Sequence, residues 1–406
     1  MDIQIRRISE DEFEPFLRVT TAAFGGTFRS DEVEPNRVEA EPEWSLAAFD
    51  GDRMVGTTAA ASFDLTVPGG MAPAAGITSV AVLPTHRRRG ILTALMRRQL
   101  DDVRDAGKPL AILHASEAVI YPRFGYGLAT MAGSFDIDTR DSASLRPLVS
   151  EGELREVDEE EALRLFPRVY ERVRHVRPGF VSRSPEWWRH RFWIPQDYRG
   201  QFGGHFFTVC EGSEGPEAYA AYRRRLAWPD DAPAGEIEIT ELVAATDPGY
   251  AATWRYLFDT DLVTRVVAYA RPVDEPLLHL LAEPRRLRFR LVDGMWVRLV
   301  DARAALEARR YRSPGRLVLD VADDFCPWNA GRYELVATED GAHCEITDAE
   351  PDLVLGAAEL GALFLGGASA WSLTRAQRIA EASPKALERA DAMFGWIPAP
   401  WCPEHF

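Results

Sequence analysis

One segment, residues 76–127, constrains the fold of this chain more than any other. Residues 77–83 form a short, apolar, β-branched run that ends at Pro84, which predicts a buried strand. Apolar residues then recur at helical spacing over residues 92–103, with charged residues on the opposite face, which predicts an amphipathic helix. A second apolar run at residues 110–114 predicts another strand. Strand, helix and strand in this order predict an α/β sheet.

The loop between the first strand and the helix contains three arginines, Arg87, Arg88 and Arg89, followed by Gly90. Free N–H groups at a helix N-terminus, the helix dipole and arginine side chains together favour an anion such as a phosphate. The alternative is a solvated, arginine-rich turn. The loop has neither a Walker Gly-Lys-Ser/Thr sequence nor GxGxxG spacing, so nucleoside triphosphates and dinucleotides are weak candidates.

Length and charge limit the number of domains and the classes of binding partner. A chain of 406 residues is too long for one core, so two or three domains are expected. Its 47 basic and 63 acidic residues give a net charge of −16, which disfavours nucleic acids and anionic membranes and attracts cationic substrates. The four cysteines lack CxxC spacing and the eight histidines do not cluster, so we expect no metal and no disulfide framework. Without a signal peptide or a membrane-length apolar run, the expected location is cytoplasmic.

The arginine loop resembles the acetyl-CoA loop of the GNAT acetyltransferase superfamily at Arg87, Gly90 and Leu92. The strings SVAVLPTHRRRG and LHASEAVIYPRFGYG are more specific, and with them the whole chain resembles the enhanced intracellular survival (Eis) family of N-acetyltransferases. This resemblance implies α/β and α+β architecture, with tandem GNAT folds, each a mixed sheet flanked by helices, followed by a sterol-carrier-type domain. It also implies a homohexamer that uses acetyl-CoA, without a metal, to acetylate a small-molecule amine.

The expected units are a GNAT domain at residues 1–140, a degenerate GNAT-like domain at 141–290 and a sterol-carrier-type domain at 291–406. In the first unit, a strand at residues 134–137 is expected to complete the sheet. In the second, the strand at 236–245 and the helix after it repeat the earlier plan without its arginines, so only one cofactor is expected per chain. In the third, lipid binding stays an alternative to a purely structural role.

Two segments outside the central motif allow alternative interpretations. The acid-rich residues 27–42, which include Asp31 and Glu32, predict either a solvated loop or a segment that gates a substrate. The tryptophans at 187, 188 and 193 could stack on nucleic-acid bases, but the acidic chain favours packing.

The resemblance places the cofactor between the end of the first strand and the start of the helix. Pantetheine is expected to pair with the strand backbone, and N–H groups freed by a bulge are expected to face the thioester oxygen. Ser116 either contacts pantetheine or caps the helix that follows. The expected cofactor-binding residues are Val80, Ala81, Val82, Arg87, Arg88, Arg89, Gly90, Ile91, Leu92 and Ser116.

The resemblance also implies the catalytic residues. Tyr126 is the expected general acid for the departing thiolate, with Tyr121 as the alternative. The expected base is the α-carboxylate of Phe406, brought into the cleft by a proline-rich tail; burial must raise its pKa from about 3.5. Ser79, His114 and Glu404 match the substrate-binding positions of the family.

We therefore predict an acetyl-CoA-dependent N-acetyltransferase whose substrate is an aminoglycoside-type polyamine that attacks the thioester directly. The alternatives are transfer to another amine, such as a peptide lysine or a polyamine, and a non-catalytic CoA- or lipid-binding scaffold. No nucleic-acid or membrane partner is expected.

Overall fold

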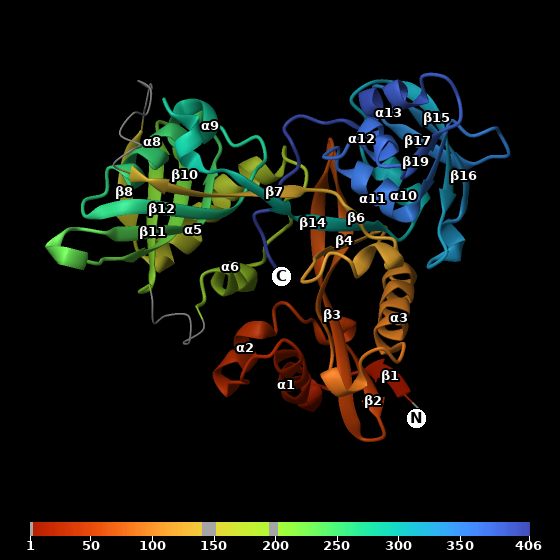
Figure 1. The fold of residues 1–406 in the computed structure, drawn as a ribbon, viewed down its shortest axis with the longest axis horizontal. Coiled ribbons are helices and arrows are strands. Elements are labelled where there is room, and N and C mark those ends of the chain that lie inside the picture. Colours follow the sequence, from red (N-terminus) through yellow and green to blue (C-terminus); the bar gives the residue numbers. More distant parts are fainter. Residues whose placement is uncertain (1–2, 140–151, 195–201) are drawn as a thin grey trace.

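The computed structural model describes residues 3–139, 152–194 and 202–406, and these residues form three β-sheets (Figure 1). The first sheet has the order β1-β2-β3-β4-β5-β14-β6. Its strands are β1 (Ile3–Arg7), β2 (Leu46–Asp50), β3 (Arg53–Val67), β4 (Gly70–Val82), β5 (Leu110–His114), β14 (Met295–Leu299) and β6 (Gly127–Leu128). Three of its helices are α1 (Phe13–Ala23), α2 (Val33–Asn36) and α3 (Ile91–Asp105).

Helices cover both faces of this first sheet because its strands are apolar on both sides. On β2, Ala47 packs in a cluster with Phe16 of α1, whereas the adjacent Ala48 packs with Leu95 of α3. Successive side chains of a strand point to opposite faces, so α1 and α3 lie on opposite sides of the sheet.

The second sheet repeats this architecture with the order β13-β7-β12-β11-β10-β9-β8. Its strands are β7 (Met131–Asp138), β8 (Glu153–Val157), β9 (His205–Gly212), β10 (Gly215–Arg225), β11 (Gly235–Ala244), β12 (Val263–Arg271) and β13 (Arg290–Asp293). Its helices include α5 (Glu159–Arg174), α6 (Pro185–Arg191), α8 (Asp247–Phe258) and α9 (Leu277–Leu280). Trp187 and Trp188 are buried, as the packing interpretation predicted.

The first two sheets exchange a strand. Strand β7 pairs with β12 of the second sheet, and β14 pairs with β5 of the first, with Met295 opposite His114. The prediction that residues 134–137 complete the first sheet is therefore wrong, and residues 295–299, which the sequence placed in the C-terminal unit, lie in the first sheet. Hydrophobic alternation identifies a strand and its buried face, but it does not identify the neighbouring strand.

The third sheet, in the order β17-β16-β15-β18-β19, belongs to the C-terminal domain. Its strands are β15 (Gly315–Ala322), β16 (Gly331–Ala337), β17 (Ala342–Ile346), β18 (Leu353–Gly356) and β19 (Ile379–Glu381). The helices of this domain are α10 (Ala302–Ala308), α11 (Ala357–Phe364), α12 (Ala370–Arg375) and α13 (Ala386–Phe394). Within the described part of the chain, no helix is both long and apolar enough to cross a bilayer.

Helix α11 packs directly on the first sheet. A Cβ atom at Gly127 of β6 would lie 1.8 Å from the carbonyl oxygen of Ala358, so this approach requires glycine. After α13 the chain returns across the molecule, and Figure 1 shows the C-terminus between the first two sheets. The tail is fixed there: the backbone N–H of Trp401 donates to the carbonyl of Pro178 (2.8 Å).

Candidate active site

The candidate site lies where strands β4 and β5 separate. They pair in parallel from Ala74 opposite Leu110 to Gly76 opposite Ile112, and no farther. Just beyond this point β4 has a bulge against β3, because Thr57 lies opposite Ala81 but Ala59 lies opposite Thr78. The bulge predicted from the family resemblance is therefore present. It interrupts the ladder at residues 79–80, on the side where two cavities open.

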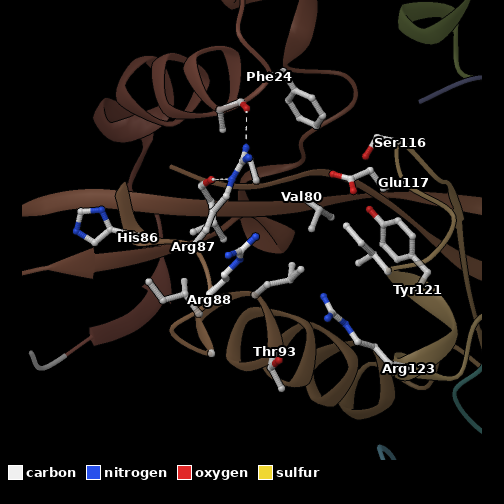
Figure 2. A pocket seen from close by; sticks show the side chains of 17 residues that line it. Phe24, Val80, His86, Arg87, Arg88, Thr93, Ser116, Glu117, Tyr121 and Arg123 are labelled. Carbon is white, nitrogen blue, oxygen red and sulfur yellow. Dashed lines mark hydrogen bonds between the residues drawn. The ribbon is translucent and has the colours of Figure 1, made fainter. Parts of the chain in front are cut away.

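The first cavity, of about 570 Å³, lies above the N-terminus of α3 (Figure 2). Gly90 precedes the helix with a φ of +81°, a conformation that glycine adopts without steric cost, and nothing lies within 4 Å of where its Cβ would be. This leaves the helix N-terminus open to an anion. Nine of the ten predicted cofactor residues line the cavity: Val80, Ala81, Val82, Arg87, Arg88, Gly90, Ile91, Leu92 and Ser116. Arg89 does not line it.

The arginines of this cavity have different surroundings. The Arg87 guanidinium donates to the carbonyls of Val82 (3.1 Å) and Ala23 (3.0 Å), so it ties the loop to the end of α1. Figure 2 shows Arg88 and Arg123 with their guanidinium groups on the cavity wall. Sequence reasoning missed Arg123, although it lies within the YPRFGYG string on which the resemblance was based. Two cationic side chains beside an open helix N-terminus suit the phosphates of an acyl-CoA.

A second cavity, of about 450 Å³, adjoins the first, since Phe24, Val80, Ser116 and Tyr121 line both. Its wall includes three predicted residues from distant parts of the chain: Ser79, His114 and Phe406. Ser79 lies at the bulge with a φ of +53°. The structure therefore brings the chain terminus to the bulge of β4.

Two carboxylates line the second cavity, Glu32 and Glu39, both from the acid-rich segment after α1. The Glu39 carboxylate also lies 2.8 Å from Nε2 of His190, on α6 of the second sheet. The segment is therefore part of the cavity wall and not merely a solvated loop. Sequence reasoning did not single out Glu39, because nothing local distinguishes it from the other acids nearby.

The two candidate tyrosines differ in whether they line the cavities. Tyr126 is 0% exposed and lines neither cavity, and among the described residues its hydroxyl has no hydrogen-bond partner. Tyr121 lies beside it, with ring centroids 6.0 Å apart, and lines both cavities. Burial raises the pKa of Tyr121, which keeps its hydroxyl protonated. The geometry thus favours Tyr121, the alternative, over Tyr126.

Glu404 does not lie where a substrate-binding residue would. Its carboxylate is buried and accepts from Nε of Arg183 (2.5 Å), with Nε of Arg191 at 3.5 Å, and it lines neither cavity. Two residues later, the Phe406 ring packs against Phe63 and His114, with centroids 5.1 and 5.3 Å apart. Glu404 therefore anchors the tail, and this correction follows from an arginine partner that lies more than 200 residues away in the sequence.

His114 is uncharged in this site. Burial and the neighbouring His405, which stacks on it at 4.9 Å, lower the pKa of His114 to about 3. Among the residues that the structure describes, no group of three His, Cys, Asp or Glu side chains could hold a metal ion.

Family models of acetyltransferases match both GNAT-like parts of the chain. A family model described as an acetyltransferase (GNAT) domain matches residues 4–129, and a second model with the same description matches residues 179–299. A sterol carrier protein domain matches residues 302–403. The chain is thus an N-acetyltransferase with two GNAT domains and a sterol-carrier-like domain, and its cosubstrate is an acyl-CoA.

Individual proteins similar to this chain identify its family among the N-acetyltransferases. An uncharacterized N-acetyltransferase of Streptomyces avermitilis is 42% identical, with 100% of both chains covered. N-acetyltransferase Eis of Mycobacterium tuberculosis is 32% identical over 97% of each chain. The crystal structure of Eis1 from Mycobacterium abscessus superimposes with a TM-score of 0.85 at 34% identity, covering 100% of both chains. This chain belongs to the Eis family of N-acetyltransferases.

Proposed function

We propose that this enzyme transfers the acetyl group of acetyl-CoA to an amine of a polycationic small molecule of the aminoglycoside type. One observation carries the proposal: the arginine-lined cavity and the acidic cavity meet at the bulge of β4, with Tyr121 in both walls and the chain terminus in the second. Acetyl-CoA supplies an acyl group activated as a thioester. The residues around it bind, orient and move protons.

The first cavity accounts for cofactor binding. Arg88, Arg123 and the N–H groups of the first turn of α3 would hold the phosphates. The backbone N–H groups freed by the bulge around Val80 would donate to the thioester oxygen, where negative charge develops as the amine attacks.

The second cavity accounts for the acceptor. Glu32 and Glu39 would attract the ammonium groups of a polyamine. An ordinary ammonium has a pKa of about 10, so the amine is protonated at neutral pH and must lose a proton before it attacks. The α-carboxylate of Phe406 would accept it. The Phe406 ring packs against Phe63 and the neutral His114 in the wall of this cavity, and burial in such surroundings raises the pKa of a carboxylate.

The departing thiolate needs a proton, and we assign this role to Tyr121 in place of Tyr126. Its side chain lies between the two cavities, and Figure 2 shows its hydroxyl on the side of Ser116 and Glu117. A raised pKa keeps that hydroxyl protonated at neutral pH, as a general acid requires.

An acceptor screen tests the proposal. With acetyl-CoA and kanamycin-type amines, we expect release of free CoA and a mass gain of one acetyl group on the amine. Acetylation of only peptide lysines or linear polyamines would support the alternative acceptor class. If acetyl-CoA binds but no amine of the panel is acetylated, the proposed acceptor class is wrong, and the non-catalytic CoA- or lipid-binding role is favoured. We also propose a homohexamer, which light scattering checks.

A further inference from the structure

The second sheet contains the same strand geometry as the candidate active site. Strands β11 and β12 pair in parallel from Gly235 opposite Val263 to Ile239 opposite Ala268, then stop, as β4 and β5 do. Strand β11 also has a bulge against β10, between Ile239 and Glu241, and α8 follows β11 as α3 follows β4. The central GNAT domain thus keeps the splayed strand pair that admits the cofactor in the first.

Side chains of the central domain make this splayed pair unsuitable for a cofactor. At the N-terminus of α8, the Thr246 hydroxyl accepts from the N–H of Gly249 (3.2 Å) and donates to the Glu217 carboxylate (2.8 Å). A carboxylate at this position repels phosphate. Arg271 of β12 reaches across to β11, where its guanidinium donates to the carbonyl of Leu242 (2.6 Å). The position that corresponds to the cofactor site of the first domain therefore has a carboxylate at the helix N-terminus and an arginine between the strands.

The C-terminal tail lies against the same splayed strands. Nε1 of Trp401 donates to the carbonyl of Ala270 at the end of β12 (2.6 Å). The Glu404 carboxylate accepts from Nε of Arg183 (2.5 Å), whose other two nitrogens donate to Glu241 at the bulge of β11 (3.0 and 2.7 Å). The tail thus contacts β12 directly through Trp401, and Arg183 links it to β11.

Arg183 is the centre of this contact. Its side chain is 0% exposed, those of Glu241 and Glu404 are 1% and 2% exposed, and its guanidinium packs on the rings of Tyr170 (4.1 Å) and Trp188 (4.5 Å). Two buried carboxylates share this arginine, with the partly exposed Arg191 as the other nearby cation. Removing the Arg183 charge would leave two buried carboxylates with Arg191 as their shared cation, which is strongly unfavourable.

We infer that the central GNAT domain has converted its splayed strands into a binding site for the C-terminal tail, and that Arg183 is the positioning residue that fixes the Phe406 carboxylate. The inference rests on the proposed role of Phe406. Glu404 is two residues from the terminus, so releasing it frees the group that must lie beside the attacking amine. Misplacing a catalytic group by about 1 Å costs on the order of 100-fold in rate.

Carboxypeptidase digestion of the full-length enzyme tests the docking itself. Mass spectrometry follows the release of Phe406 from wild type, Arg183→Gln, Arg183→Lys and Glu404→Gln. We expect wild type to resist, Arg183→Gln and Glu404→Gln to lose Phe406 at least about tenfold faster, and Arg183→Lys to lie between them because it keeps the charge. Arg189→Gln, on the exposed face of helix α6, which begins two residues after Arg183, is the matched control and should resist as wild type does.

Kinetics then separate positioning from general stability. In Arg183→Gln we expect kcat to fall about 100-fold while the KM for acetyl-CoA stays within about twofold, since the first cavity is untouched. The inference is overturned if Arg183→Gln and Glu404→Gln keep the tail resistant. A second result would also overturn it. In this result, lengthening the chain beyond Phe406 abolishes activity, yet both variants release the tail and keep full kcat. If Arg183→Gln does not fold, Glu404→Gln alone decides by the same criteria.

The two proposals can fail independently. If a chain extended beyond Phe406 works at full rate, the Phe406 carboxylate is not the base, and the proposed mechanism fails. The carboxypeptidase result does not depend on turnover, so it still decides whether the central domain binds the tail.

Discussion

A hydroxyl can protonate a leaving thiolate only if it reaches the reacting atoms, and this requirement separates Tyr121 from Tyr126. Tyr121 lines both cavities, whereas the Tyr126 hydroxyl is enclosed behind it. We expect Tyr121→Phe to lower kcat about 100-fold without changing acetyl-CoA affinity, because only proton donation is lost. Steady-state kinetics with acetyl-CoA titrations measure both quantities.

Tyr126→Phe is the matched control for that variant. Its hydroxyl makes no hydrogen bond with a described residue, so its removal should leave kcat within about threefold of wild type. A loss in Tyr126→Phe as large as in Tyr121→Phe would instead restore Tyr126 as the acid.

His114 should make stability depend on pH. Its pKa is about 3 in the folded state, against an ordinary value near 6.5, so the unfolded chain takes up this proton first as the pH falls. His114 therefore leaves the free energy of unfolding unchanged above pH 6.5. Below this pH it lowers the free energy of unfolding progressively, by about 2 kcal/mol at pH 5. Urea denaturation should show a smaller loss between pH 7 and pH 5 in His114→Gln than in wild type. An unchanged loss in His114→Gln would contradict the prediction.

At the scale of elements, the loop before α3 divides its arginines between structure and binding. Arg88 and Arg123 lie on the cavity wall, whereas Arg87 holds the end of α1. We expect Arg88→Gln and Arg123→Gln each to raise the KM for acetyl-CoA about tenfold, with kcat nearly unchanged, since each removes a charge-assisted contact to phosphate. Isothermal titration with CoA gives the affinity directly.

Arg89→Gln is the control for these two variants because Arg89 does not line the cavity. Its KM for acetyl-CoA should stay within about twofold of wild type. If all three substitutions weaken binding equally, the general positive charge of the loop, and not the cavity wall, holds the phosphates.

At the scale of the whole molecule, the exchanged strands bind the two GNAT domains together. Strand β5 needs β14 as a neighbour, and β7 needs β12. A fragment of residues 1–139 lacks β14 and β12, so it has an unpaired edge at β5 and an unpartnered strand β7. We expect this fragment to show no cooperative thermal transition by circular dichroism, whereas the full chain should. A cooperatively folded fragment that binds acetyl-CoA would contradict this expectation.

Much of the first GNAT domain could be predicted from the sequence, because its signals are local. The arginines, Gly90 and the amphipathic pattern of residues 92–103 lie within one continuous segment, so the strand, loop and helix that hold the cofactor could be located along the chain. The family strings then indicated two GNAT folds, a third domain and a tail that reaches the cleft.

Tertiary structure alone decided which of these residues meet. The choice between Tyr121 and Tyr126 depends on which hydroxyl faces a cavity, and both tyrosines lie in the short connection between β5 and β6. Glu404 meets Arg183 across 221 residues, and β14 pairs with β5 from nearly as far. Local sequence determines strands, helices and turns through steric and hydrophobic periodicity, but burial and charge pairing depend on contacts between distant segments, which exist only in the folded chain.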